Sequence, residues 1–213
     1  MIIEERNMVK SSEVGCFPTV EALQSTLPRN VRIHMKRVGK YADILYQYML
    51  KRNIENVQED LGGDFTRHSE EIFALHDIGR HFIPFALLNK VGGLSEEEIQ
   101  TIKNHTVNAR KAIKSIYIQP FPDGMMEQWE KIAVYHHERF DGGGYPEGKK
   151  GKEIPIGARI CAIADTYDGI VSWKPYKKKQ TTKEEAVQII EGEAGGQFQP
   201  ELVGIFKECV DRF

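Results

Sequence analysis

The residues of this chain that could do chemistry are its histidines, because most of them fall on predicted apolar helix faces. Five of the seven lie on such faces or at their ends, namely His34, His76, His105, His136 and His137. Burying one imidazole without a partner costs on the order of 1 to 3 kcal/mol, so five in one core need many hydrogen bonds or metal ions. Each histidine alone is more simply an ordinary core residue. Together they favour metal binding.

Two aspartates extend this set of donors. Asp77 follows His76 directly, and Asp165 lies on the apolar face of a later predicted helix. Five imidazoles and two carboxylates are enough for two ions that share a bridging carboxylate and keep positions open for water. Iron, manganese and zinc all accept such nitrogen and oxygen ligands, and the spacing does not choose among them.

The adjacent pair His136 and His137 runs directly into a loop of unusual composition. Residues 140–146 read Phe-Asp-Gly-Gly-Gly-Tyr-Pro, so glycine makes the loop flexible and Tyr-Pro restrains it again. One interpretation is a surface turn beside a core histidine. The other is a binding site, and the donors elsewhere in the chain favour the second interpretation.

Helices must position these donors, because apolar residues recur at spacings of three and four along most of the chain. After an irregular lead-in over 1–30 that contains a short helix near 19–27, we predict helices over about 31–53, 66–78, 95–118, 125–139, 156–173, 182–191 and 199–213, with a short helix or turn over 85–89. Ser95 followed by Glu98 is a capping box for the helix over 95–118. No alternating strand pattern of useful length occurs, so the predicted fold class is all-α.

Composition limits the classes of partner. Lys and Arg number 29 against 31 Asp and Glu, a formal charge of -2, so no global field exists to hold a nucleic-acid polymer. The three cysteines, Cys16, Cys161 and Cys209, are far apart and odd in number, which argues against a disulfide framework. The first residues carry acids where a signal peptide would be basic, and no apolar run reaches the length of a membrane span. We therefore expect a cytoplasmic protein that does not contact membranes.

The donors and their order resemble the HD superfamily of metal-dependent phosphohydrolases. The resemblance lies in His34, the run His76-Asp77-Ile78-Gly79 and Asp165, and His105, His136-His137 and the loop over 140–146 are similar to the HD-GYP branch. So are residues 154–155, 162–168 and 174–177, the last reading Lys-Pro-Tyr-Lys. The match covers about residues 31–210. That family is all-helical, binds two or three metal ions, often iron or manganese, and hydrolyses cyclic di-GMP to pGpG and then GMP. The resemblance implies that residues 31–213 form an HD-GYP catalytic domain, with a metal centre in the core of a helical bundle and the GYP loop at the pocket edge.

The resemblance also implies a division of the ligands between two ions. His34, His76, Asp77 and Asp165 would surround one ion; His105, His136 and His137 would hold the second, with Asp77 bridging the two. Family members with a third metal have a glutamate four residues before the first histidine. This chain has Asn30 there, which favours two ions. Iron or manganese is expected, with zinc or nickel as alternatives.

Such a ligand set predicts hydrolysis of a phosphodiester. Two ions roughly 3.5 to 4 Å apart would bridge a hydroxide for in-line attack on phosphorus, so no protein nucleophile is needed. Asp77 and Arg80 are the expected catalytic residues, since Arg80 would neutralise the phosphate in the transition state. Asp168, one turn beyond Asp165, is expected to orient a ligand or a nearby cation.

Substrate contacts are expected from charged and aromatic residues around the centre. Arg80 would contact the reacting phosphate, and Lys174 and Lys177 would hold the second phosphate or nucleotide. The family usually has Lys in place of Arg80 and Arg in place of Lys174, so a positive charge is kept at both positions. The planar, two-pronged donor geometry of a guanidinium is gained at Arg80 and lost at Lys174. Tyr145 and Pro146 would pack over a base, shape the pocket lip, or form a rigid loop that positions a partner.

Two other functions stay open from the sequence. The substrate could be another cyclic dinucleotide, such as cyclic GMP-AMP, or another nucleotide. The chain could also be a low-activity module that binds a nucleotide or a partner. The roughly 30 residues ahead of the resemblance are too few for a receiver domain. A separate regulatory protein that delivers the signal is therefore expected. A homodimer is a further expectation.

Overall fold

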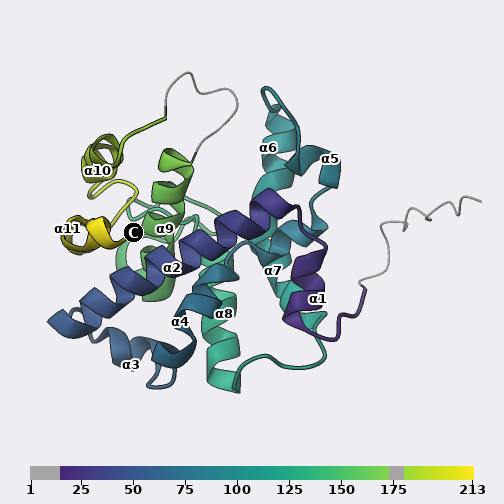
Figure 1. The fold of residues 1–213 in the computed structure, drawn as a ribbon, viewed down its shortest axis with the longest axis horizontal. Coiled ribbons are helices and arrows are strands. Elements are labelled where there is room, and N and C mark those ends of the chain that lie inside the picture. The colour runs from purple at the N-terminus through teal and green to yellow at the C-terminus, as the bar shows by residue number, and fades with distance from the viewer. Residues whose placement is uncertain (1–14, 173–179) are drawn as a thin grey trace, which may run out of the picture.

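The computed structural model describes residues 15–172 and 180–213, and over these ranges the chain forms helices joined by loops (Figure 1). Within the described ranges, β-pairing is limited to two isolated bridges, Phe17 with Ile116 and Ala194 with Phe198. The predicted all-α fold class is therefore confirmed. The elements run in the order α1 (Val20–Ser25), α2 (Arg29–Arg52), α3 (Val57–Leu61), α4 (Phe65–Ala74), η1 (Ile78–Phe82), α5 (Phe85–Leu88), α6 (Glu96–Lys103), α7 (His105–Lys114), α8 (Asp123–Tyr135), η2 (Gly151–Glu153), α9 (Ile156–Val171), α10 (Lys183–Gly192), α11 (Pro200–Cys209) and η3 (Val210–Arg212).

The long helix α2 crosses the whole molecule and contacts α4, α9 and α11 (Figure 1). Its buried residues include Val31, Met35, Val38 and Ala42, which follow the predicted spacing of three and four. Gly39 marks the crossing with α4, where an added Cβ would lie 2.6 Å from a backbone oxygen of that helix. This close approach places the inner face of α2 directly over the end of α4.

The end of α4 differs from the prediction, and the difference creates a turn. The sequence predicts a helix to residue 78, but α4 ends at Ala74, residues 75–77 form a turn, and the 3-10 helix η1 follows. Apolar spacing continues through the turn, so periodicity does not reveal the break. η1 lies against α7 so closely that a Cβ on Gly79 would be 2.0 Å from the carbonyl oxygen of His105. Glycine therefore sets the distance between the His76-Asp77 turn and α7.

The predicted helix over 95–118 is two helices. Its start is confirmed, because Ser95 and Glu98 form both hydrogen bonds of the capping box. The helix breaks at Asn104, which ends α6 and begins α7, and α7 itself ends at Lys114. The apolar spacing again runs through the break, so the sequence pattern misses it. The break turns the chain at the residue that precedes His105.

Other boundaries differ by a few residues, and one helix is not predicted. α8 ends at Tyr135 rather than near residue 139, so His136 and His137 lie just past its end. α9 ends at Val171, two residues before the predicted position. The short helix α3 forms where a polar loop is expected. The short helix near 19–27, the short helix over 85–89 and the last two helices are present as predicted.

The described part of the N-terminal segment joins the main core. Val20, Leu23 and Leu27 are buried in the same apolar cluster as α2 and α4. A domain boundary near residue 30 therefore stays a prediction, with α1 packed onto the fold. Among the described residues, no helix combines the length and apolar character needed to cross a bilayer.

Candidate metal centre

The predicted ligands come from five separate segments and meet in the core. His34 lies on α2, His76 and Asp77 in the turn after α4, His105 at the start of α7, His136 and His137 just after α8, and Asp165 on α9. The side chains of His76, His105, His136 and Asp77 are at most 1% exposed, and those of His34 and Asp165 are 19% and 17% exposed. The centre is therefore largely buried, and His34, Asp165 and the half-buried His137 are its more exposed members.

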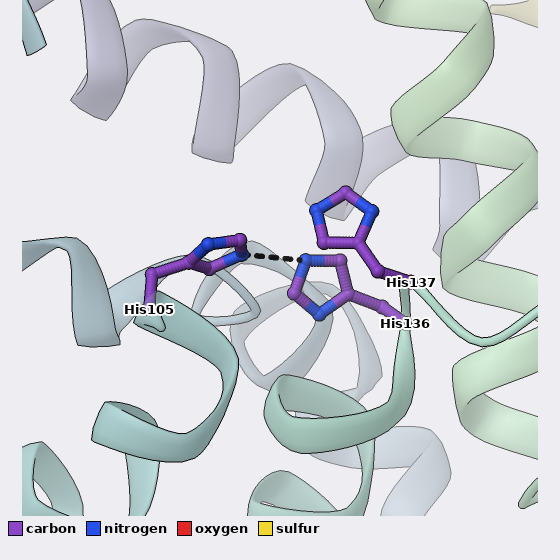
Figure 2. Close-up of side chains that lie close together, drawn as sticks. All are labelled: His105, His136 and His137. Carbon is purple, nitrogen blue, oxygen red and sulfur yellow. Dashed lines mark hydrogen bonds between the residues drawn. The ribbon is translucent and has the colours of Figure 1, made fainter. Parts of the chain in front are cut away.

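The histidines form two groups of donors. His34 and His76 gather with Asp77, and His105 gathers with His136 and His137; within each group the ligand atoms lie within 4.8 Å of one another. In Figure 2 the three rings of the second group turn toward one another, and Nε2 of His105 lies 3.4 Å from Nε2 of His136. Each group has the residue types and the spacing that a divalent ion requires.

The carboxylate of Asp77 lies between the two groups. Its Oδ2 is 3.5 Å from Nε2 of His34 and 3.5 Å from Nε2 of His76. Its Oδ1 is 3.2 Å from Nε2 of His105 and 3.8 Å from Nε2 of His136. One carboxylate therefore presents a different oxygen to each group.

Asp165 adds a second carboxylate to the first group. Its Oδ1 lies 3.1 Å from Nε2 of His34 and 4.0 Å from Nε2 of His76. Asp165 also interacts electrostatically with His137 of the second group, but its ion-pair distances are to the first group. The structure thus brings together all seven residues that the sequence predicts as ligands.

Local hydrogen bonds fix the orientation of the buried rings. Nδ1 of His76, His105 and His136 each lies near the carbonyl oxygen three residues earlier, at 3.0, 2.7 and 3.0 Å. A carbonyl can only accept, so Nδ1 carries the proton in each ring and Nε2 keeps its lone pair. Because these lone pairs point into the centre, the backbone itself prepares the three imidazoles to bind a cation.

Several buried atoms at the centre have no hydrogen-bond partner among the described residues. They are Nε2 of His76, both carboxylate oxygens of Asp77, Nε of Arg80 and Oε2 of Glu138, and among them Nε of Arg80 and Oδ2 of Asp77 form an ion pair at 2.6 Å. Folded proteins pair the great majority of buried polar atoms, so such a concentration needs an explanation. Divalent ions would satisfy Nε2 of His76 and Oδ1 of Asp77, which have neither a hydrogen bond nor an arginine partner among the described residues, so the residues present fit a metal centre.

Burial keeps the histidines of the second group neutral. Desolvation lowers the pKa of His105 to about 3 and lowers the pKa of His136 and of His137. Burial alone would raise the pKa of Asp77, but the charges of Arg80 and the neighbouring imidazoles hold it well below its usual range. Neutral imidazoles beside an ionised carboxylate are the protonation states that a metal ion requires.

His34 experiences the opposite electrostatic environment. Burial would lower its pKa, but hydrogen bonds to Asp165, Asp168 and Asp77 outweigh burial and raise the pKa to about 11. The same three carboxylates would attract a divalent cation. Three carboxylates, from α9 and from the turn after α4, therefore surround His34.

Asp168 contacts both a predicted ligand and a cation. Its side chain is 1% exposed, and its Oδ2 lies 2.7 Å from Nδ1 of His34. It also accepts hydrogen bonds from Arg37, at 2.5 Å from Nε and 2.8 Å from Nη2. The sequence interpretation did not select Arg37, although its position one turn after His34 on α2 was a usable signal.

Arg80 borders the centre beside the carboxylate of Asp77. Its Nε lies 2.6 Å from Oδ2 of Asp77, and its side chain is 25% exposed. A guanidinium held here can reach both the buried carboxylate and an incoming anion. The predicted contact of Arg80 with the reacting phosphate stays a prediction.

The loop that follows the tandem histidines packs against His137. The ring of Tyr145 stacks on the ring of His137 at 4.9 Å, and its backbone N–H donates to the carbonyl oxygen of His137 at 3.2 Å. Glu138, which the sequence interpretation overlooked, is 2% exposed and accepts the backbone N–H of Glu147 at 2.7 Å. Pro146 is half-buried in the same loop. Tyr145 thus lies at the edge of the second group of donors.

Two predicted substrate contacts cannot be placed in this site. Lys174 and Lys177 lie outside the described residues. Their predicted role in binding the second phosphate therefore stays a prediction. The other predicted substrate contacts, Arg80, Tyr145 and Pro146, all lie beside the metal centre or in the adjoining loop.

Comparisons with known proteins agree with this geometry. The sequence profile described as HD domain matches residues 66–202. A cyclic di-GMP phosphodiesterase of Thermotoga maritima is 40% identical over 161 residues, which cover 73% of this chain and 42% of that protein. A cyclic di-GMP phosphodiesterase response regulator of Xanthomonas campestris is 31% identical, covering 94% of this chain and 50% of that protein. A 3'3'-cGAMP-specific phosphodiesterase of Vibrio cholerae is 32% identical, covering 65% and 26%. The chain spans half or less of the length of these relatives.

Proposed function

The chain belongs to the HD domain family, in its HD-GYP branch, and we propose that it is a metal-dependent phosphodiesterase that hydrolyses cyclic di-GMP to pGpG, GMP or both. Membership implies dependence on divalent metal ions. The proposed catalytic domain comprises residues 31–213, which include the whole profile match. The relatives named as cyclic di-GMP phosphodiesterases support the choice of substrate.

The geometry of Asp77 is the observation that carries the proposal. One buried carboxylate directs Oδ2 toward two histidines and Oδ1 toward two others, and neither oxygen accepts a well-aligned hydrogen bond among the described residues, although Oδ2 forms an ion pair with Nε of Arg80 at 2.6 Å. A carboxylate that served only the fold would accept such hydrogen bonds. This arrangement supports a centre of two ions that share Asp77 as a bridging ligand.

The proposed ligand sets follow the two groups. His34, His76, Asp77 and Asp165 would hold one ion, and His105, His136, His137 and Asp77 would hold the other. When bound, two such ions supply a water-derived nucleophile at neutral pH and offset the charge of a phosphodiester. We propose iron or manganese. The proposal of two ions is supported by Asn30, an exposed amide in the first turn of α2 where a carboxylate would be needed for a third.

The remaining residues of the site bind, orient and neutralise. Arg80, held by Asp77, would donate to a phosphate oxygen and neutralise charge that develops there. Asp168 would hold His34 in its binding orientation through Nδ1. Tyr145 would line the pocket edge, because its ring covers the ring of His137. A regulatory protein partner, a homodimer and a cytoplasmic location stay predictions.

A panel of substrates tests the proposed function. Purified protein loaded with Fe(II) or Mn(II) is expected to release pGpG or GMP from cyclic di-GMP. Asp77→Ala and Asp77→Asn should lower kcat by roughly a thousandfold or more, because charge stabilisation by metal ions provides several kcal/mol of transition-state stabilisation. Metal content is measured in parallel by elemental analysis.

The same panel separates the alternatives. Hydrolysis of 3'3'-cGAMP without hydrolysis of cyclic di-GMP would reassign the substrate, as the Vibrio cholerae relative suggests. Metal-loaded protein that binds cyclic di-GMP but releases no product would instead indicate a binding module. Protein with no bound transition metal, and with stability unchanged by Asp77→Asn, would contradict the metal centre itself.

A further inference from the structure

Lys103 places a cation at the edge of the candidate metal centre. It lies in the last turn of α6, two residues before His105. Its Nζ is 5.1 Å from the centroid of the Tyr145 ring, in a cation–π contact. Its side chain is half-buried.

Tyr145 contacts both Lys103 and His137. Its ring receives the ammonium group of Lys103 and stacks on the His137 ring, with 4.9 Å between the two ring centroids and an interplanar angle of 22°. By the sum of these two distances, the ammonium is within about 10 Å of the His137 ring. It is therefore close to the proposed ions but too far away to be part of their ligand set.

The charge of Lys103 is less compensated than that of neighbouring cations. Arg80 has Nε 2.6 Å from Asp77, and Arg37 makes two hydrogen bonds to Asp168. No carboxylate of the described residues lies within 4.0 Å of the Lys103 ammonium, which contacts the Tyr145 ring. An ammonium group without a counter-ion at the pocket edge can accept an anion without giving up an existing ion pair.

We propose that Lys103 binds the second phosphate of a cyclic dinucleotide, the phosphate that is not being cleaved. This inference rests on the proposed function. The two phosphates of such a substrate lie on opposite sides of a twelve-membered ring, so when one is at the ions the other projects away from them. Lys103 stands on the Tyr145 side of the centre, so it would bind that phosphate alongside Lys174 and Lys177, whose predicted role is also to hold the second phosphate. The contact would contribute to the binding and selection of cyclic dinucleotides and not to bond cleavage.

A purely structural role for Lys103 makes a different prediction. A lysine in the last turn of a helix stabilises the helix dipole, and a cation over Tyr145 helps hold that ring. Either role would act on the metal centre through Tyr145 and His137, so its loss would affect every substrate equally. A phosphate contact would affect only substrates that carry a second phosphate.

Steady-state kinetics with two substrates distinguish these roles. Cyclic di-GMP carries two phosphates, and bis(4-nitrophenyl) phosphate carries one. The variants are Lys103→Met, which keeps an unbranched chain over Tyr145 without the charge, and Lys103→Arg, which keeps the charge. Lys114→Met is the matched control, because Lys114 is an exposed lysine in the last turn of α7.

Lys103→Met is expected to raise KM for cyclic di-GMP roughly tenfold, the size expected of a partly exposed charge-assisted hydrogen bond. Lys103→Arg should restore most of this loss, and Lys114→Met should change nothing. All three variants should keep KM and kcat for bis(4-nitrophenyl) phosphate within about twofold of the unmodified protein. Equal losses on both substrates, or no loss on cyclic di-GMP, would overturn the inference.

Failure of the proposed function would be visible separately. Unmodified protein that hydrolyses bis(4-nitrophenyl) phosphate but not cyclic di-GMP would refute that function. Cyclic di-GMP would then be tested as a competitive inhibitor of the one-phosphate reaction. An inhibition constant that Lys103→Met raises roughly tenfold would support the contact, and an unchanged constant would overturn it.

Discussion

Two clusters of buried polar side chains lie along α9, and the protein satisfies only one of them by itself. In the first turn of α9, Arg159 donates to the carbonyl oxygen of Ile154 at 2.9 Å, to Glu55 at 2.8 Å and to Gln199. Gln199 in turn donates to Glu55 at 2.7 Å, and Lys152 completes the set with an ion pair to Glu55 at 2.8 Å. This cluster ties the loop after α2 to the starts of α9 and α11.

The second half of α9 contributes to the metal centre, where the bonding is incomplete. Here the protein orients His76 and Asp77, but within the described ranges Nε2 of His76 and Oδ1 of Asp77 have no hydrogen-bond partner, and Oδ2 of Asp77 has an ion pair with Arg80 in place of a hydrogen bond. Both clusters are buried and charged, so burial and charge alone do not identify a functional site. The distinguishing feature is that oriented donors and acceptors are left without partners, which is unfavourable for the fold unless a ligand binds.

Removing metal is expected to give the largest difference in thermal stability between variants of the two clusters. Ions present at about 100 times their Kd add about 2.7 kcal/mol to the free energy of unfolding, so excess chelator should lower Tm by roughly 5 to 10 °C. The measurement is differential scanning calorimetry with and without chelator. Glu55→Gln should show the same chelator effect, and Asp77→Asn should show almost none. A chelator effect of equal size in Asp77→Asn would contradict the proposed centre.

Asp168 tests whether orientation of a ligand matters within the metal centre. Asp168→Asn keeps the shape of the side chain but weakens its bonds to His34 and Arg37, so metal affinity should fall roughly tenfold to a hundredfold. Titration of metal into metal-free protein in competition with a chromogenic chelator measures the change. Asp43→Asn is the control. Asp43 lies on α2, the helix that carries His34, but its carboxylate accepts a hydrogen bond from the Ser69 hydroxyl and contacts no proposed ligand. Equal affinities in the two variants would show that Asp168 does not position His34.

Glu55 tests the satisfied cluster, and the effect should be smaller. Glu55→Gln weakens the bonds to Arg159 and Lys152 and should lower the free energy of unfolding by about 1 to 2 kcal/mol, with metal affinity unchanged. Urea denaturation measures the difference. Glu59→Gln, at an exposed glutamate of α3, should be neutral. A loss of metal affinity in Glu55→Gln would remove the distinction between the two clusters.

The Glu55 effect should also depend on pH. Burial would raise the pKa of Glu55, but bonds to Lys152, Gln199 and Arg159 lower it below the ordinary value of 4.5. A carboxyl group whose pKa is lowered by folding stabilises the protein above its unfolded pKa and loses that contribution as pH falls through its folded pKa. The difference between the unmodified protein and Glu55→Gln should therefore be full at pH 7 and shrink below about pH 4.5.

Much of the fold was predictable because it rests on local patterns. The spacing of apolar residues gave the all-α class and most helices, and the capping box at Ser95 gave the start of α6. The helix ends at Ala74, Asn104 and Tyr135 were not predictable in this way, because apolar periodicity continues across each of them. These three ends are the places where the chain turns its histidines toward the centre.

The supporting residues were harder to predict than the donors. Arg37 and Glu138 act through partners that are distant in sequence or belong to the loop backbone, namely Asp168 and the N–H of Glu147. Lys103 gains its position from Tyr145, more than forty residues later in the chain. Such contacts have no local signature, so only the folded arrangement reveals them.

The sequence by itself determined the chemistry of the centre. Imidazoles and carboxylates on inward helix faces favour binding of a divalent metal ion when they come together. Tertiary structure decided how they meet. The close approach at Gly79 brings the His76-Asp77 turn against α7, and Asp77 then lies between the two groups of histidines. A carboxylate can be shared between two groups only when segments from distant parts of the chain are brought together, and no spacing along the sequence encodes that distance.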